Sequence, residues 1–135
     1  MKTYVFDASA LFAFLQDQAG ASKVDELLRE AMRSRAKVMI SAVNYGEVYG
    51  AILRQHGSEQ ALTALDAIRP LPIDVLDATP QRACKAADLK VKHKLYYADS
   101  FAAALAIEHK AALVTSDSDF RKLGHGFPVV WLKSS

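Results

Sequence analysis

The chain has 135 residues, of which 51% are hydrophobic and 24% charged, so it can bury one hydrophobic core and is not intrinsically disordered. Its formal net charge of +2 is too small to indicate nucleic-acid binding by bulk electrostatics. The longest apolar run, residues 101–107, is far too short to span a bilayer, and the single cysteine, Cys84, excludes an intramolecular disulfide framework.

Short apolar runs and helical patterns alternate along the chain. Runs rich in β-branched and aromatic residues predict strands, and apolar residues at a period of 3.6 predict helices. In chain order the predicted elements are a strand at 3–6, a helix at 8–15, a helix from Ser22 to about Arg33, a strand at 37–40, a helix from Ser41 to about Leu53, a helix after residues 57–59 to Ile68, a strand at 73–76, a helix from Thr79 to about Val91, a helix that opens at Ala98 or Asp99, and strands at 111–115 and 128–132.

Capping residues predict where three of these helices begin. Ser22, with Asp25 three residues later, is a variant of the capping box, and Ser41 has the residue type of an N-cap. Thr79 is followed by a proline at the first helical position, a combination typical of a helix N-terminus. The helix that contains residues 101–107 is apolar nearly all round, which predicts that this segment is buried.

The alternation of strands and helices predicts the fold class. Short strands separated by helices pair in parallel through right-handed crossovers. We therefore predict an α/β fold, a single three-layer α/β/α domain of residues 1–135 with a central, mainly parallel sheet. Because Asp7 interrupts the apolar N-terminus before a signal-peptide core can form, we also expect a soluble, cytoplasmic protein.

Four acids stand among apolar or small neighbours, whereas solvated acids usually have charged ones. Asp7 follows the first predicted strand and Asp117 the fourth, Glu47 lies in the helix after the second strand, and Asp99 begins the apolar helix. Ligand sites of open parallel sheets lie beyond the carboxyl ends of the strands. We therefore expect these four side chains to converge there, although capping and strand-end solvation are the ordinary roles of single acids at such positions.

Two glycines, Gly46 and Gly50, flank Glu47 in the middle of its helix, where each costs about 1 kcal/mol relative to alanine. Their spacing of four residues makes a flat stripe that another backbone or a ligand can approach closely. We therefore expect Glu47, which lies next to this stripe, to point inward.

Converging acids need protons or cations. Two carboxylates about 4 Å apart repel by about 4 kcal/mol at an effective dielectric constant near 20. No lysine lies within three residues of any of the four acids. Carboxylate oxygens favour one or two Mg²⁺ or Mn²⁺ ions, whereas zinc prefers histidine or cysteine, and the four histidines show no ligand spacing.

The segments around these acids resemble, in order, those of the PIN-domain nucleases, and more closely those of VapC-type toxins of toxin–antitoxin systems. The matching blocks are VFDASAL at 5–11, GE at 46–47, YADSFAAALA at 97–106 and LVTSDSDF at 113–120. The resemblance spans the chain and implies a metal-dependent endoribonuclease with a compact α/β/α fold. It also implies RNA as substrate, a VapB-type antitoxin that holds the enzyme inactive, and a homodimer. The short apolar runs predict no membrane association.

The resemblance assigns roles to individual residues. The catalytic, metal-binding acids would be Asp7, Glu47, Asp99 and Asp117, and the auxiliary residues Ser9, Thr115 and Asp119. Asp119 has a second interpretation, because an acid before a short helical segment commonly caps it. One or two Mg²⁺ ions, with Mn²⁺ as a substitute, would activate a water for in-line attack on a phosphodiester and leave 5′-phosphate and 3′-hydroxyl ends.

Basic and aromatic residues offer candidates for RNA contacts. Arg121 and Lys122 follow Asp117 by four and five residues and are expected to contact RNA phosphates. For the other basic residues, a solvated helix face is the more common role, and for the tyrosines core or interface packing is more common than base stacking. These further residues are Arg29, Arg33, Arg35, Lys37, Lys85, Lys90, Lys92 and Lys94, and Tyr45, Tyr49, Tyr96 and Tyr97.

Three other functions compete with an RNA-cleaving toxin. A haloacid-dehalogenase-like phosphatase also places an aspartate after its first strand, but it needs a second acid two residues later, where this chain has Ser9. A metal-dependent nuclease that acts on DNA, or without an antitoxin, would use the same acids. A non-catalytic module would bind RNA or a partner, although all four acids are present.

Overall fold

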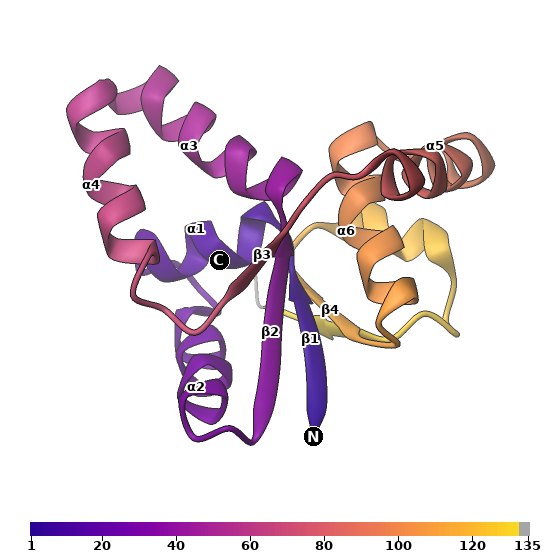
Figure 1. Ribbon diagram of the computed structural model, residues 1–135, viewed down its shortest axis with the longest axis horizontal. Coiled ribbons are helices and arrows are strands. Elements are labelled where there is room, and N and C mark those ends of the chain that lie inside the picture. Colours follow the sequence, from indigo (N-terminus) through magenta and orange to yellow (C-terminus); the bar gives the residue numbers. More distant parts are fainter. Residues whose placement is uncertain (133–135) are drawn as a thin grey trace.

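The computed structural model describes residues 1–132, and its centre is a five-stranded sheet in which every strand pairs in parallel. The strands are β1 (Lys2–Phe6), β2 (Ala36–Ser41), β3 (Asp74–Leu76), β4 (Ala112–Thr115) and β5 (Val129–Trp131), and their spatial order is β3-β2-β1-β4-β5. The chain therefore runs from β1 to one edge of the sheet and returns to the other side of β1 (Figure 1). The order reverses between β1 and β4, which is where open α/β sheets bind ligands.

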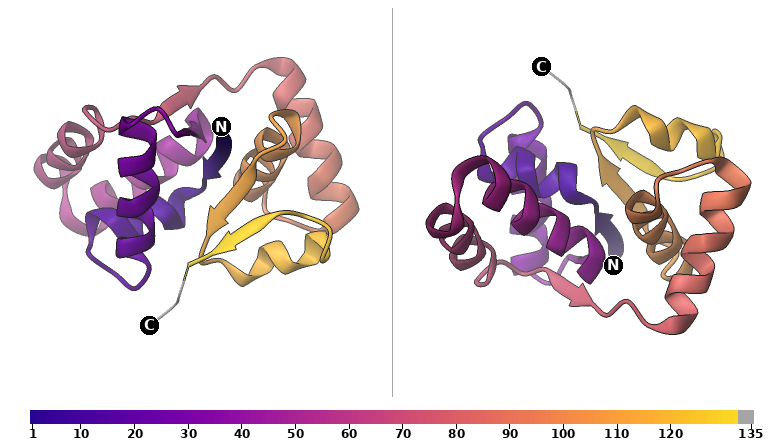
Figure 2. Two further views of the ribbon diagram at one scale, coloured as in Figure 1. Left: turned by 90° about the horizontal axis from the view of Figure 1, so that it is seen from below. Right: turned by 90° about the horizontal axis from the view of Figure 1, so that it is seen from above.

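Helices cover both faces of this sheet. They are α1 (Ala8–Leu15), α2 (Ala21–Met32), α3 (Ala42–His56), α4 (Ser58–Ile68), α5 (Pro80–His93), α6 (Tyr97–Glu108) and the 3₁₀ helix η1 (Ser118–Leu123). Figure 1 shows α1, α2 and α4 on one side of the sheet and α5 and α6 on the other, and the views in Figure 2 show the same separation. The predicted three-layer α/β/α architecture is therefore confirmed, with a sheet that is parallel throughout.

Neighbouring residues of the central strands face opposite layers, as the period of two in a strand requires. Phe6 and Ile40 pack in the core cluster formed with α1 to α4, whereas Val5 and Met39 pack in the cluster formed with α6. Each of these four side chains is at most 1% exposed. The sheet is thus apolar on both faces, which leaves its carboxyl edge as the place where polar side chains from several strands can meet.

Capping confirms some helix starts and corrects others. The Ser41 hydroxyl accepts from the Val43 amide and the Thr79 hydroxyl from the Arg82 amide, as predicted for these N-caps. The start predicted at Ser22 is wrong, because α2 begins one residue earlier, after Gly20. Gly20 has a φ of 94°, and a Cβ there would lie 2.9 Å from Leu132 Cβ. Both the backbone conformation and the close contact therefore favour glycine as the residue before α2.

Two further helix boundaries differ from the predicted ones. Helix α3 continues to His56, one turn beyond the predicted end at Leu53, and stops at Gly57, which has a φ of 89°. Helix α6 begins at Tyr97, so Asp99 lies in its first turn and does not cap it. Ile107, expected to be buried, is 54% exposed, because it lies between two surface pockets, one against α5 and one against the segment before β5.

None of the helices within residues 1–132 is long and apolar enough to cross a membrane. Residues 133–135, which the predicted domain includes, lie outside the described part of the chain.

Candidate metal centre

Asp7 lies directly after β1 and is only 4% exposed. Its Oδ1 caps α1 by accepting from the Ala10 amide at 3.1 Å, and it also accepts from the Ser9 hydroxyl at 2.6 Å. Its Oδ2 accepts from the Thr115 hydroxyl at 2.5 Å. Three of about four acceptor positions are therefore used, which leaves one on Oδ2 for a further ligand. Asp7 is thus a buried bridge between α1 and β4, and the alternative of an acid solvated at a strand end is wrong.

The hydroxyls of Ser9 and Thr115 also hold the loop after β4. Ser9 Oγ accepts from the Ser116 amide and Thr115 Oγ1 from the Asp117 amide, each at 2.9 Å. Both hydroxyls therefore donate to the Asp7 carboxylate while accepting from the backbone that carries Asp117. The auxiliary positions predicted from the sequence thus lie between Asp7 and the next acid.

Three carboxylates meet beyond the carboxyl edge of the sheet. Asp99, Asp117 and Asp119 each offer one oxygen, and these atoms all lie within 4.8 Å of one another. All three residues are half-buried. Asp7 and Glu47 lie outside this group of three. The structure therefore brings together two of the four acids singled out from the sequence, plus Asp119, for which the sequence predicts an auxiliary role.

Asp117, and not Asp119, caps the 3₁₀ helix η1, and both belong to the group of three carboxylates. Asp117 Oδ1 accepts from the Asp119 amide at 2.9 Å and is the N-cap of η1. The interpretation that Asp119 caps this segment is therefore wrong. Its carboxylate, which lies in the first turn of η1, is available to the acidic group instead.

The electrostatics of this region disfavour ionised carboxylates. Burial raises the pKa of Asp99 to about 7, with repulsion from Asp117 as the second cause and smaller repulsions from Glu47, Asp7 and Asp119. Burial also raises the pKa of Asp7 to about 6, although its hydrogen bonds act in the opposite direction. None of the five ion pairs within residues 1–132 includes any of these acids. Within the described part of the chain, no basic side chain therefore forms a direct ion pair with them.

Glu47 is exposed, contrary to the prediction that it points inward beside a glycine stripe. Gly46 and Gly50 face open space, since a Cβ on either would meet no atom within 4 Å. Glu47 nevertheless acts on Asp99, because repulsion from its carboxylate is one of the causes that raise the pKa of Asp99. Glu47 therefore lies at the solvent side of the acidic region.

Asn44 is the polar residue of this region that sequence reasoning missed. It is completely buried, and its Nδ2 donates to Glu47 Oε1 at 2.9 Å and to the Ala98 carbonyl at 3.0 Å. Asn44 thus ties Glu47 to the first turn of α6, next to Asp99. A signal was present in the sequence, because Asn44 occupies the same buried stripe of α3 as Val48 and Ile52, where an amide needs a partner.

The residues expected to contact RNA phosphates have partners within the chain. The guanidinium of Arg121 lies 4.5 Å from the ring centroid of Trp131, a cation–π geometry. Lys122 Nζ donates to the Lys94 carbonyl at 3.2 Å. Both side chains remain exposed, so these contacts position them without removing them from solvent.

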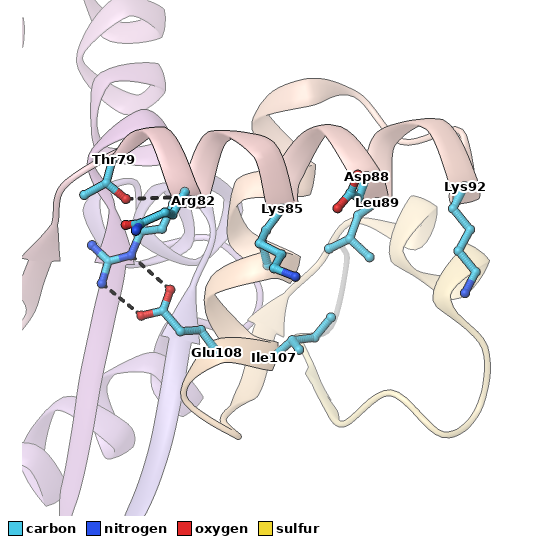
Figure 3. A pocket seen from close by; sticks show the side chains of 10 residues that line it. Thr79, Arg82, Lys85, Asp88, Leu89, Lys92, Ile107 and Glu108 are labelled. Carbon is cyan, nitrogen blue, oxygen red and sulfur yellow. Dashed lines mark hydrogen bonds and ion pairs between the residues drawn. The ribbon is translucent and has the colours of Figure 1, made fainter.

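A pocket of about 700 Å³ between α5 and α6 is separate from this centre (Figure 3). At one end Arg82 and Glu108 point toward each other and form a two-bond pair, Nε to Oε1 and Nη2 to Oε2, both at 3.0 Å. Leu89 and Ile107 contribute apolar surface, and no acid of the candidate centre lines the pocket. Despite its size, this pocket is therefore not the place where the uncompensated carboxylates meet.

The family model described as PIN domain matches residues 4–126. No curated protein sequence shows significant similarity to the chain.

Several solved structures share this fold, among them two complexes named VapBC and a toxin named VapC20. VapBC2 from Rickettsia felis, bound to a DNA fragment from its promoter, matches at 16% identity and a TM-score of 0.76, over 97% of this chain and 99% of that chain. DNA-bound VapBC from Salmonella typhimurium matches at 15% identity and a TM-score of 0.72, over 96% of this chain and 98% of that chain. VapC20 from Mycobacterium tuberculosis, a Sarcin-Ricin loop cleaving toxin, matches at 20% identity and a TM-score of 0.71, over 90% of this chain and 95% of that chain. At these identities the likeness shows the fold.

Proposed function

The chain belongs to the PIN-domain family, and from this premise we propose that it is a metal-dependent endoribonuclease and the toxin of a toxin–antitoxin pair. The observation that carries the proposal is the group formed by Asp99, Asp117 and Asp119, whose carboxylate oxygens lie within 4.8 Å of one another and pair with no basic side chain of residues 1–132. Two members of this group, Asp117 and Asp119, follow β4, which pairs with β1 at the switch point of the sheet.

The donor atoms fit a hard divalent cation. Asp99, Asp117 and Asp119 offer carboxylate oxygens only, the ligand type that Mg²⁺ and Mn²⁺ take, and Asp7 keeps one acceptor position on Oδ2. The raised pKa values of Asp7 and Asp99 support the same assignment, because a cation favours the ionised carboxylates that burial and mutual repulsion disfavour. A bound Mg²⁺ supplies Lewis acidity, which lowers the pKa of water and neutralises charge on a phosphodiester.

The protein's own residues position the reacting groups. Ser9 and Thr115 fix the Asp7 carboxylate, so it cannot rotate away from the edge of the sheet. Asn44 fixes Glu47 at the solvent side, where its free oxygen can accept a proton from an attacking water. Such pre-set acceptors lower the entropic cost of an in-line displacement.

Cleavage assays with purified full-length protein test the proposal. We expect it to cut single-stranded RNA in Mg²⁺ or Mn²⁺, to stop in EDTA, and to recover when the ion is restored. The cut ends should carry 5′-phosphate and 3′-hydroxyl groups. Asp99→Asn should be inactive, whereas Asp88→Asn, which changes an aspartate on α5 outside the acidic group, should cleave as the unmodified protein does. Cleavage that persists in EDTA would contradict the metal assignment.

The alternatives predict different outcomes in the same assay. Equal cleavage of single-stranded RNA and DNA of one sequence would favour a nuclease without sugar specificity. Binding of RNA with no cleavage in any divalent ion would favour a non-catalytic module. For the partner, co-expression with a small protein encoded beside the gene should give a complex that no longer cleaves, and light scattering should detect the proposed homodimer.

A further inference from the structure

A second pocket, of about 550 Å³, lies where the turn between α5 and α6 meets η1. The residues that line it are Lys90, Lys94, Leu95, Tyr96, Asp119 and Lys122. Asp119 also belongs to the group of three carboxylates, so the pocket borders the candidate metal centre directly. Three lysines therefore lie beside the group of carboxylates. This arrangement suits an anionic ligand that contacts the lysines and extends toward a cation bound by the carboxylates.

The contacts around the pocket place these lysines. Lys94 ends α5 with a φ of 56°, in the left-handed region, and its carbonyl accepts from Lys122 Nζ at 3.2 Å. This bond joins the α5–α6 turn to η1, and it uses one of the three donors of the Lys122 ammonium. None of the ion pairs within residues 1–132 includes Lys90, Lys94 or Lys122. Their charges are therefore available to an anion from solution.

Tyr96 adds an aromatic surface at the rim. It is 75% exposed, although its backbone is fixed as the N-cap of α6. The adjacent Tyr97 differs, because its ring packs edge-on against Phe101 at 5.0 Å and its hydroxyl donates to the Ala83 carbonyl at 3.4 Å. An exposed aromatic ring beside lysines is typical of surfaces that stack unpaired bases.

We propose that this pocket binds the single-stranded RNA segment that flanks the scissile bond. Lys90, Lys94 and Lys122 contact backbone phosphates, and Tyr96 stacks on an unpaired base. The proposal rests on the proposed function, since it takes the substrate of the neighbouring acidic group to be RNA. It also gives a reason for specificity, because bases paired in a duplex cannot stack on Tyr96.

Binding measured without cleavage tests this subsite. The probe is a fluorescein-labelled single-stranded RNA of about 12 nucleotides, a length within the range of site sizes of single-strand binding grooves. Anisotropy titrations are run in EDTA at several salt concentrations with the full chain. The test variant carries Lys90→Gln, Lys94→Gln and Lys122→Gln. The matched control carries Lys2→Gln, Arg54→Gln and Lys110→Gln, which remove three exposed positive charges outside the pocket.

The expected results separate local contacts from overall charge. The test variant should bind more weakly and reduce the slope of log K against log salt by about 2, since each phosphate contact on a single strand contributes roughly 0.7. The control should keep the unmodified slope. Tyr96→Ala should weaken binding about tenfold, whereas Tyr96→Phe, which keeps the ring, should bind normally.

Other results would overturn the subsite. Equal losses in the test and control variants would mean that only net charge matters, and no loss in either would mean that RNA lies elsewhere. Equally tight binding of a duplex of the same sequence would exclude base stacking on Tyr96. A failure of the proposed function appears separately, as a lack of Mg²⁺-dependent cleavage by the unmodified protein, while the binding titrations still report on the pocket.

Discussion

The carboxylates of Glu108 and Asp99, which lie at the two ends of helix α6, have pKa values shifted in opposite directions. In the pocket between α5 and α6, the hydrogen bonds and charge of Arg82 lower the pKa of Glu108. At the carboxyl edge of the sheet, burial and repulsion from other acids raise the pKa of Asp99 to about 7. The first carboxylate is neutralised within the chain, whereas the second depends on a proton or a cation from solution. Uncompensated charge, more than pocket size, is therefore the feature on which the proposed active site rests.

The largest effect is expected when one uncompensated charge is removed. Asp99→Asn keeps the shape of the side chain but lowers the charge of the acidic group by one. We expect RNA cleavage to fall by about 10²-fold or more, while the melting temperature in EDTA stays the same or rises because repulsion is relieved. Mg²⁺ should raise the melting temperature of the unmodified protein and much less that of the variant. Clear destabilisation of Asp99→Asn in EDTA would contradict the repulsion argument.

A positioning residue should give the next largest effect. Asn44→Ala removes the donor to Glu47 and to the Ala98 carbonyl, so we expect the free energy of unfolding to fall by about 1–3 kcal/mol. Val48→Ala, one turn further along the same buried stripe of α3, is the matched control for lost packing. Urea unfolding checks both. At a temperature where both variants are folded, cleavage should be slower for Asn44→Ala only, and an equal rate would reduce Asn44 to a structural role.

The pH dependence of stability should distinguish the two regions further. The folded-state pKa values of Asp7 and Asp99, about 6 and about 7, lie above the ordinary value of 3.8. Between about pH 4 and about pH 7 the folded state therefore binds more protons than the unfolded state, so these acids reduce stability as pH rises. We expect a lower melting temperature in EDTA at about pH 8 than at about pH 5, and a larger gain from Mg²⁺ at the higher pH. Asp99→Asn should flatten this profile.

The smallest effect is expected from the compensated pair. Arg82→Gln removes the partner of Glu108 at a partly exposed position, so the free energy of unfolding should change by no more than about 1 kcal/mol. Cleavage should be unaffected, since the pair lies away from the acidic group. NMR titration should show the pKa of Glu108 rising toward its ordinary value. A marked loss of cleavage would mean that the α5–α6 pocket and the candidate metal centre are coupled.

Local patterns predicted the architecture because they depend on neighbours in the chain. The alternation of strands and helices, the caps at Ser41 and Thr79, and the position of Asp7 at a strand end all follow from spacing and residue type. One error, the start of α2, lies where a distant residue comes close, since a Cβ on Gly20 would lie 2.9 Å from Leu132 Cβ.

The sequence by itself therefore determined the α/β class, the order of the elements and the family of this protein. Only the tertiary structure decided which acids meet, that Asp117 caps η1 while Asp119 joins Asp99, and that Asn44 holds Glu47. For the contacts between distant segments the physical reason is distance along the chain, whereas the cap by Asp117 and the bond from Asn44 to Glu47 join near neighbours whose spacing allows more than one pairing. The bond from Thr115 to Asp7 spans 108 residues and that from Asn44 to Ala98 spans 54, so both depend on a strand order that no local pattern encodes.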